Sequence, residues 1–126
     1  MKDNKYTILY IDDEEVNLRL FKNSFRRDFD ILIASSAREG LEILKNNTID
    51  VVITDQRMPE ITGVEFLKIV NERYPDIPPN RLILSGYSDA DQIEKAFNEY
   101  RLYRFVSKPW NVDELKIIIL EAINQK

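Results

Sequence analysis

The sequence predicts an α/β protein in which one parallel sheet of five strands carries helices on both faces. Short apolar runs rich in β-branched residues alternate five times with longer segments whose apolar residues recur at helical spacing. Strands that alternate with single helices pair in parallel through right-handed crossovers. The chain of 126 residues fits one domain, which we expect to span residues 1–126.

The first part of the chain predicts a strand, a helix and a second strand. Tyr6–Ile11 is an apolar run that stops at the acidic residues 12–15, whose charge suits the positive end of a helix dipole. The helix should bury a stripe of apolar residues at helical spacing, namely Val16, Leu20, Phe21 and Phe25. The next apolar run, residues 30–34, is the second expected strand.

Two capping-box patterns frame the third expected strand. Ser36 followed by Glu39 opens the second helix, and Thr62 followed by Glu65 opens the third. Between them, residues 49–54 form the third expected strand, in which a run rich in β-branched residues, Val51–Thr54, stops at the carboxylate of Asp55. Such a run is typical of a parallel strand that is buried on both faces.

The remaining elements follow the proline-rich loop at residues 75–79. Arg81–Leu84 and Tyr103–Ser107 are the fourth and fifth strands. A helix from about Ser88 or Asp89 to Tyr100 has a weaker apolar stripe, mainly Ile93, Ala96 and Phe97. The last helix begins with a cap formed by Asn111 and Glu114, and its inward residues are expected to be Leu115, Ile118, Ile119, Ala122 and Ile123.

Five strands in a doubly wound sheet favour the flavodoxin-like (βα)5 sandwich with strand order 2-1-3-4-5. In such sheets binding and catalytic groups lie just past the carboxyl ends of the strands, where the strand order reverses. That point falls between the first and third strands. The strand ends should therefore bring five polar side chains to one edge of the sheet: Asp12, Asp13, Asp55, Ser85 and Lys108.

Composition excludes several kinds of chemistry. The chain has no cysteine and no histidine, which removes disulfides, Ser/His and Cys/His catalysis and the commonest transition-metal ligands. The net charge of −4 argues against direct nucleic-acid binding. No apolar run approaches the ~20 residues that span a bilayer, and the first residues are not a signal peptide, so we expect a cytoplasmic protein without membrane contact.

The five side chains together have the chemistry of phosphoryl transfer. Three neighbouring carboxylates repel one another, and a hard dication such as Mg²⁺, which prefers oxygen ligands, would relieve the repulsion. Lys108 adds a positive charge for a phosphoryl oxygen or for Asp55, and Ser85 offers a hydrogen-bond donor. Each residue alone is an ordinary turn or helix-cap residue, so the interpretation depends on all of them occurring together.

These residues resemble the receiver domains of bacterial two-component response regulators, and the resemblance covers essentially the whole chain. It consists of the acidic pair Asp12-Asp13, the run from Asp55 through Met58-Pro59 to Gly63, the hydroxyl at Ser85 and the dipeptide Lys108-Pro109. The resemblance implies a phosphoacceptor signalling domain rather than an enzyme, with at most self-catalysed phosphorylation and dephosphorylation.

The resemblance also implies a role for each site residue. Asp55 would accept a phosphoryl group from the phosphohistidine of a sensor histidine kinase or a histidine phosphotransfer protein, which fits the absence of histidine here. Asp13, Asp55 and the backbone carbonyl of Arg57 would bind Mg²⁺ directly, and Asp12 largely through water. Lys108 would contact the phosphoryl group, and its bond to Pro109 would be cis.

The implied output is a conformational switch that controls an output domain or a partner. Ser85 would move toward the phosphate and Phe105 would turn inward, although Phe105 lacks the hydroxyl of the tyrosine that is frequent there. The face formed by the fourth helix, fifth strand and fifth helix mixes both charge signs, which suits a homodimer and equally an ordinary solvated surface. The side chain of Arg57 has two interpretations, a shield for the acyl phosphate and a solvated loop residue.

Three alternatives remain open from the sequence. A flavin-binding electron carrier of the same fold needs a phosphate-binding loop after the first strand, where this chain has four acids. A phosphatase of the haloacid dehalogenase type needs a second aspartate two residues after the nucleophile, where this chain has Arg57. A receiver-like interaction module that takes up no phosphate is disfavoured by the complete set of site residues. The sequence also leaves open whether the domain stands alone or is a fragment of a longer regulator.

Overall fold

The computed structural model, which describes residues 5–76, 80–86 and 90–124, contains a parallel five-stranded sheet of order β2-β1-β3-β4-β5. The strands are β1 (Thr7–Ile11), β2 (Asp30–Ala34), β3 (Val51–Asp55), β4 (Arg81–Ser85) and β5 (Leu102–Ser107). The helices are α1 (Glu15–Phe25), α2 (Ala37–Asn46), α3 (Gly63–Arg73), α4 (Ala90–Glu99) and α5 (Val112–Ile123). The predicted fold class and strand order are confirmed.

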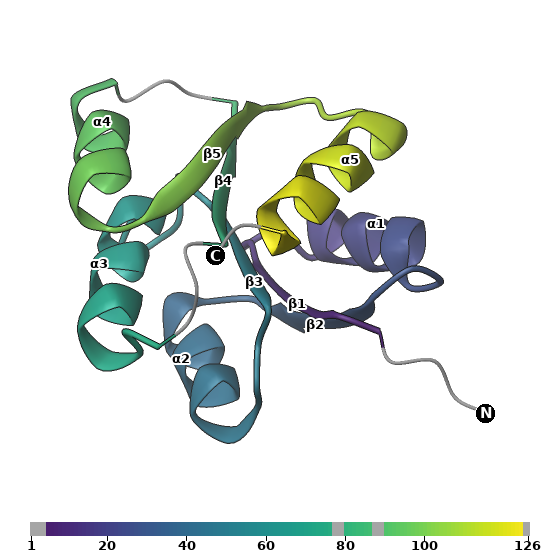
Figure 1. Cartoon of the computed structure of the whole chain (residues 1–126), viewed down its shortest axis with the longest axis horizontal. Coiled ribbons are helices and arrows are strands. Elements are labelled where there is room, and N and C mark those ends of the chain that lie inside the picture. Colours follow the sequence, from purple (N-terminus) through teal and green to yellow (C-terminus); the bar gives the residue numbers. More distant parts are fainter. Residues whose placement is uncertain (1–4, 77–79, 87–89, 125–126) are drawn as a thin grey trace.

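The helices form one layer on each face of the sheet. Figure 1 shows α1 and α5 together on one face and α2, α3 and α4 on the other. Five parallel strands separated by single helices require this winding, because each crossover must return over one face of the sheet. Among the residues that the structure describes, no helix has the length and apolar character that crossing a membrane requires.

The register of the central strands decides where the site lies. Ile11 at the end of β1 pairs with Thr54 of β3. The next residue on each strand is therefore an aspartate, Asp12 or Asp55, and the two leave the sheet side by side. On the other side of β3, Asp55 pairs with Leu84, the residue before Ser85.

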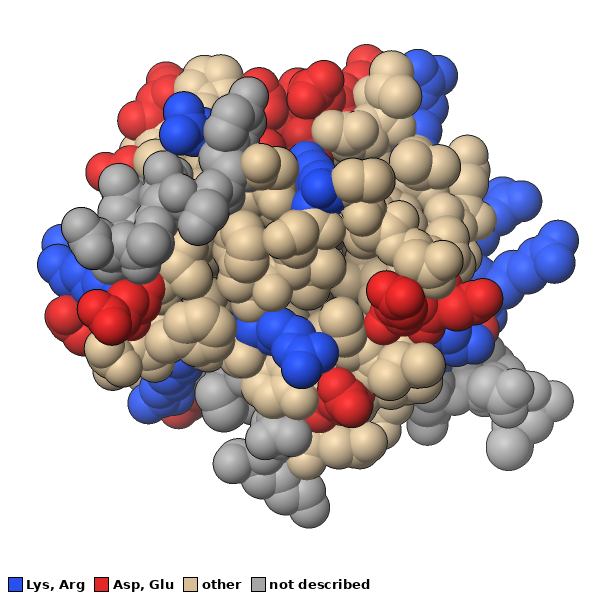
Figure 2. All heavy atoms as spheres, turned by 90° about the horizontal axis from the view of Figure 1, so that it is seen from above, with Lys and Arg blue, Asp and Glu red and all other residues tan. Residues whose placement is uncertain are grey.

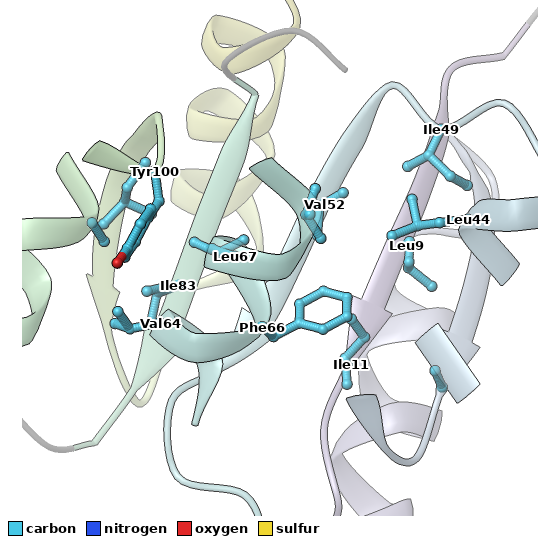
Figure 3. Close-up of a cluster of buried hydrophobic side chains, with 14 of the residues drawn as sticks. Leu9, Ile11, Leu44, Ile49, Val52, Val64, Phe66, Leu67, Ile83 and Tyr100 are labelled. Atoms are coloured by element: carbon cyan, nitrogen blue, oxygen red, sulfur yellow. The ribbon is translucent and has the colours of Figure 1, made fainter. Parts of the chain in front are cut away.

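Apolar side chains bury both faces of the sheet. Figure 3 shows the cluster between the sheet and α2, α3 and α4, in which Phe66 of α3 points toward Ile11 of β1. The second cluster lies on the opposite face and joins β1, β3 and β4 to α1 and α5 through side chains such as Phe21, Phe25 and Leu115. The central strands are buried on both sides because helices cover both faces.

The apolar stripe predicted for α1 is partly wrong. Phe21 and Phe25 are buried as expected, but Val16 is 68% exposed and Leu20 is 55% exposed. The third buried residue of the helix is Leu18, which shares a face with Phe21 and Phe25 at spacings of three and four residues. Val16 and Leu20 form a separate stripe that faces away from the sheet.

The stripe predicted for α4 is wrong at one position. Ile93 and Ala96 are buried, whereas Phe97 is 45% exposed. Tyr100 completes the buried face instead, because it follows Ala96 by four residues and Phe97 is rotated by about 100° from Ala96. The predicted start at Ser88 or Asp89 lies outside the described residues.

The predicted helix caps are confirmed. Thr62 accepts a hydrogen bond from the backbone N–H of Glu65, and the Glu65 side chain accepts one from Thr62, so α3 has a complete capping box. Ser36 accepts from the backbone N–H of Glu39, and Asn111 accepts from that of Glu114. These caps stabilise the starts of the helices that follow β2, β3 and β5.

Candidate functional site

Three carboxylates meet where β1 and β3 end. Asp12 is fully buried, Asp55 is nearly so, and Asp13 is exposed. One oxygen from each of Asp12, Asp13 and Asp55 lies within 4.8 Å of the others. The strand register causes this meeting, because parallel strands that end together deliver their next residues to one edge.

Lys108 joins the carboxylates from the end of β5. Its Nζ lies 3.1 Å from Oδ1 of Asp55 and 3.3 Å from Oδ2 of Asp12. The backbone N–H of Lys108 donates to the carbonyl oxygen of Ser85, which fixes the loop after β5 to the end of β4. The Lys108–Pro109 peptide bond is cis, as expected.

The charges of this cluster depend on one another. Burial raises the pKa of Asp55 above its usual value, and the nearby Asp12 carboxylate adds to the increase, although Lys108 opposes it. Burial alone would lower the pKa of Lys108, but Asp12 and Asp55 outweigh burial and raise it. Lys108 is therefore a firmly charged ammonium that compensates part of the negative charge.

The backbone after Asp55 is fixed by close packing. The Thr54 hydroxyl donates to the carbonyl oxygen of Asp55 at 2.9 Å. The backbone N–H of Gly63 donates to the carbonyl oxygen of Gln56 at 2.9 Å, and the buried Gln56 side chain accepts from the backbone N–H of Val64. A Cβ at Gly63 would clash with the carbonyl oxygen of Asp55, so α3 must begin with glycine to lie this close to β3.

The other residues singled out from the sequence occupy three different positions. Ser85 ends β4 and is almost completely buried. Phe105 is half-buried on β5, opposite Ile83, and packs against the cluster of α2, α3 and α4. Arg57 lies two residues past Asp55 with its side chain exposed.

Tyr10 and Asn17 are site residues that the sequence interpretation missed. The Tyr10 hydroxyl donates to Oδ2 of Asp12 at 2.6 Å, and the Asn17 amide donates to the same oxygen at 3.2 Å. A signal for Tyr10 was present, because residues two apart on a strand share a face, which places Tyr10 on the same face as Asp12. Nothing in the sequence pattern distinguishes Asn17 from other polar residues of α1.

A second buried polar group lies at the opposite end of the sheet. Arg81 begins β4 and donates from Nη1 to Oδ1 of Asn71 and to the carbonyl oxygen of Tyr100, each at 3.0 Å. Burial lowers the pKa of Arg81 to about 10. These bonds join α3, β4 and the end of α4, so we assign Arg81 a structural role.

The acidic cluster fits a hard dication. Its ligand atoms are carboxylate oxygens, which suit Mg²⁺, and their mutual distances are short enough for one ion to contact more than one of them. The exposure of Asp13 leaves one side open to solvent, as an ion that retains water ligands requires. Figure 2 shows acidic side chains mostly toward the rim of the face seen from above, and basic side chains both at the rim and among the uncharged residues nearer its middle.

Comparison with known proteins adds a family match. The family model described as "Response regulator receiver domain" matches residues 8–120. The hydrogenase transcriptional regulatory protein HoxA of Cupriavidus necator is 38% identical over 123 residues, covering 98% of this chain and 25% of that protein. The chain thus spans about a quarter of the length of this curated relative.

Solved structures show the same arrangement. A response regulator receiver domain protein from Clostridium thermocellum is 37% identical with a TM-score of 0.84, and the match covers 94% of each chain. The receiver domain of an HD domain-containing protein from Pseudomonas fluorescens Pf-5 is 29% identical with a TM-score of 0.86, over 98% of this chain and 90% of that one. The chain thus has the same fold as these two proteins and about a third of their sequence in common.

Proposed function

The chain belongs to the response regulator receiver domain family, a family of phosphoacceptor signalling domains, and on this basis we propose that Asp55 is its phosphoacceptor. The observation that carries the proposal is the contact of Asp55 with Lys108 next to the carboxylates of Asp12 and Asp13. A buried carboxylate with a lysine at 3.1 Å is held in place for attack on a phosphorus atom.

The transfer step needs little chemistry from the chain beyond positioning and charge. A carboxylate oxygen of Asp55 forms a bond to phosphorus while the phosphorus–nitrogen bond of a donor phosphohistidine breaks. The electron pair of that bond stays on the departing imidazole. Lys108, already within hydrogen-bond distance of Asp55, can then hold an oxygen of the transferred phosphoryl group.

The same cluster would hold Mg²⁺. We assign Asp13, Asp55 and the backbone carbonyl of Arg57 as direct ligands, with Asp12 acting largely through water. The burial of Asp12 and its contacts with Tyr10, Asn17 and Lys108 suit this indirect role. When bound, Mg²⁺ neutralises negative charge on the carboxylates and the phosphoryl oxygens.

The signalling response would begin at Ser85 and Phe105. The Ser85 hydroxyl is one residue beyond the register partner of Asp55, which makes it a suitable donor to a phosphoryl oxygen. Phe105 is only partly buried and packs against the cluster of α2, α3 and α4, so an inward turn would increase the burial of its ring. We propose that this change reaches the face formed by α4, β5 and α5, where a homodimer or an output domain would respond.

The partners follow from the chemistry. These 126 residues contain no histidine, so the phosphohistidine donor lies outside them, and we propose that it belongs to a sensor histidine kinase or a histidine phosphotransfer protein. Catalysis by the domain is limited to its own phosphorylation and dephosphorylation. The charge of −4 disfavours direct contact with nucleic acid, so binding to DNA would be the task of an attached output domain.

Intact mass measurement tests the proposal. The native chain, incubated with acetyl phosphate and Mg²⁺, should gain one phosphoryl group, and Asp55→Ala should gain none. Asp50→Ala is the control, because Asp50 precedes β3 at the end opposite to Asp55. This variant should still gain one phosphoryl group. A gain of one phosphoryl group in Asp55→Ala as well would place the acceptor elsewhere, and no gain in the native chain would favour an interaction module that takes up no phosphate.

A further inference from the structure

We propose that Tyr10 is a positioning residue, whose hydroxyl orients the Asp12 carboxylate and thereby keeps Lys108 shared between Asp12 and Asp55. The inference rests on the proposed function, because it concerns the readiness of the same site for Mg²⁺. It adds a residue from the interior of β1 to the groups that determine metal affinity.

The hydrogen bonds of Asp12 support this role. Its Oδ2 accepts from the Tyr10 hydroxyl at 2.6 Å, the Asn17 amide at 3.2 Å and the Lys108 ammonium at 3.3 Å. Its Oδ1 accepts from the backbone N–H of Glu14 at 3.0 Å. The shortest of these bonds is the one from Tyr10, so the hydroxyl makes the closest contact of any donor to the oxygen that also faces Lys108.

An aromatic stack fixes the Tyr10 ring itself. The ring is almost fully buried and stacks on Phe21 with a centroid distance of 4.3 Å and an interplanar angle of 26°. Phe21 also makes an edge contact with Trp110 at 6.0 Å. Trp110 follows Lys108 by two residues, so these aromatic contacts connect Tyr10 to the loop that carries Lys108, and both residues donate to Oδ2 of Asp12.

Loss of the hydroxyl should weaken Mg²⁺ binding for two reasons. Mg²⁺ requires nearly ideal octahedral geometry. An Asp12 carboxylate with fewer fixed contacts would orient a water ligand of the ion less well, which lowers the affinity of the site. In addition, Oδ2 without the Tyr10 donor would attract the Lys108 ammonium more strongly, and Lys108 competes with a dication for the same carboxylates. Both effects raise the dissociation constant.

The test is an amide chemical-shift titration of the folded chain with MgCl₂, corrected with NaCl at matched ionic strength. Tyr10→Phe keeps the ring on Phe21 and should raise the Mg²⁺ dissociation constant about tenfold, the lower end of the range for groups behind a metal ligand. Tyr103→Phe is the matched control, since Tyr103 packs against the same cluster but takes no part in the Asp12 contacts described above. It should leave the constant unchanged.

A double-mutant cycle separates positioning from a general structural effect. In an Asp12→Ala background the effect of Tyr10→Phe on the Mg²⁺ dissociation constant should largely vanish, because no side-chain oxygen remains at position 12 for the hydroxyl to orient. Equal effects in both backgrounds, or an unchanged or lower constant in Tyr10→Phe alone, would overturn the inference while leaving the proposed function intact. Failure of the native chain to bind Mg²⁺ would overturn both.

A measurement on the native chain tests the role of Tyr10 even if the Tyr10→Phe variant does not fold. The buried, hydrogen-bonded hydroxyl proton of Tyr10 should exchange slowly enough to be seen by NMR, and its resonance should move when Mg²⁺ is added. A Tyr10 hydroxyl resonance that stays fixed while the amides of Asp13 and Asp55 shift would contradict the role that we assign to Tyr10.

Discussion

Lys108 lies 3.1 Å from Asp55 and 3.3 Å from Asp12, so one ammonium group is shared by the two buried carboxylates of the site. With Asp13 alongside, the cluster carries more negative than positive charge. The imbalance makes the folded chain sensitive to protonation, to added dications and to the removal of a single carboxylate.

Asp55→Asn should stabilise the folded chain at pH 7 without Mg²⁺. Burial raises the pKa of Asp55 in the folded state, so the folded chain holds this proton more tightly than the unfolded chain. The tighter binding of this proton stabilises the folded chain at pH values below the ordinary carboxyl pKa. This contribution to stability is lost as the pH rises through the raised pKa of folded Asp55. Urea unfolding should show a gain for Asp55→Asn at pH 7 that shrinks toward pH 4.

The exposed edge-strand variant Asp30→Asn is the control for that experiment. It should change the free energy of unfolding by less than about 0.5 kcal/mol at pH 7. A lower stability for Asp55→Asn than for the native chain at pH 7 would mean that Lys108 more than compensates the buried charge.

Mg²⁺ should raise the free energy of unfolding of the native chain. A ligand that binds only the folded state at a hundred times its dissociation constant stabilises by about 2.7 kcal/mol. Asp13→Asn should remove most of this effect, because it takes away the solvent-facing carboxylate of the cluster. Glu15→Gln, which changes an exposed acid outside the cluster, should keep it; an Mg²⁺ effect of equal size in both variants would place the ion elsewhere.

Gly63→Ala should destabilise the chain by about 1–3 kcal/mol, the range for forcing extra atoms into a packed site. The added Cβ would clash with the carbonyl oxygen of Asp55 and lie 3.1 Å from the Cα of Gln56, and backbone atoms cannot move aside as a flexible side chain can. Thermal and urea unfolding measure the loss. Gly86→Ala is the matched control, since a Cβ there meets nothing within 4 Å and should be nearly neutral. Equal losses in both variants would refute the packing explanation.

Ser85→Ala should uncouple phosphorylation from the response of α4. Intact mass should still show the gain of a phosphoryl group at Asp55, because the hydroxyl is not the acceptor. The amide shifts of α4 and β5 on adding beryllofluoride and Mg²⁺ should become smaller than in the native chain. Ser107→Ala is the control, because Ser107 is the register partner of Ser85 on β5. This variant should keep the amide shifts of the native chain. A full response in Ser85→Ala would show that the switch does not pass through this hydroxyl.

Most of the fold and the site could be predicted from the sequence. Both follow from patterns within short segments and from the rule that the carboxyl ends of parallel strands meet at one edge of the sheet. The alternation of apolar runs with helical stripes is enough to predict a parallel sheet, and strand ends then place Asp12, Asp55 and Lys108 together. The helix starts at Ser36 and Thr62 were also predictable, because a capping box is a contact within one turn.

The remaining features depend on contacts between distant segments. Whether α1 buries Leu18 or Leu20 is decided by a rotation of the helix against the sheet, and both residues are equally apolar. The requirement for Gly63 arises only when α3 packs on the end of β3. The bond from Tyr10 to Asp12 lies between these cases, since strand periodicity places both residues on one face but does not show that the hydroxyl reaches the carboxylate.

The most direct test of the central claim locates the phosphoryl group itself. The native chain, treated with acetyl phosphate and Mg²⁺ and then with sodium borohydride, should contain homoserine in place of aspartate at position 55, because borohydride reduces an acyl phosphate but not a free carboxylate. Peptide mass spectrometry should find this change at Asp55 alone, and only when Mg²⁺ is present. Homoserine at Asp12 or Asp13, or none at Asp55, would contradict the account.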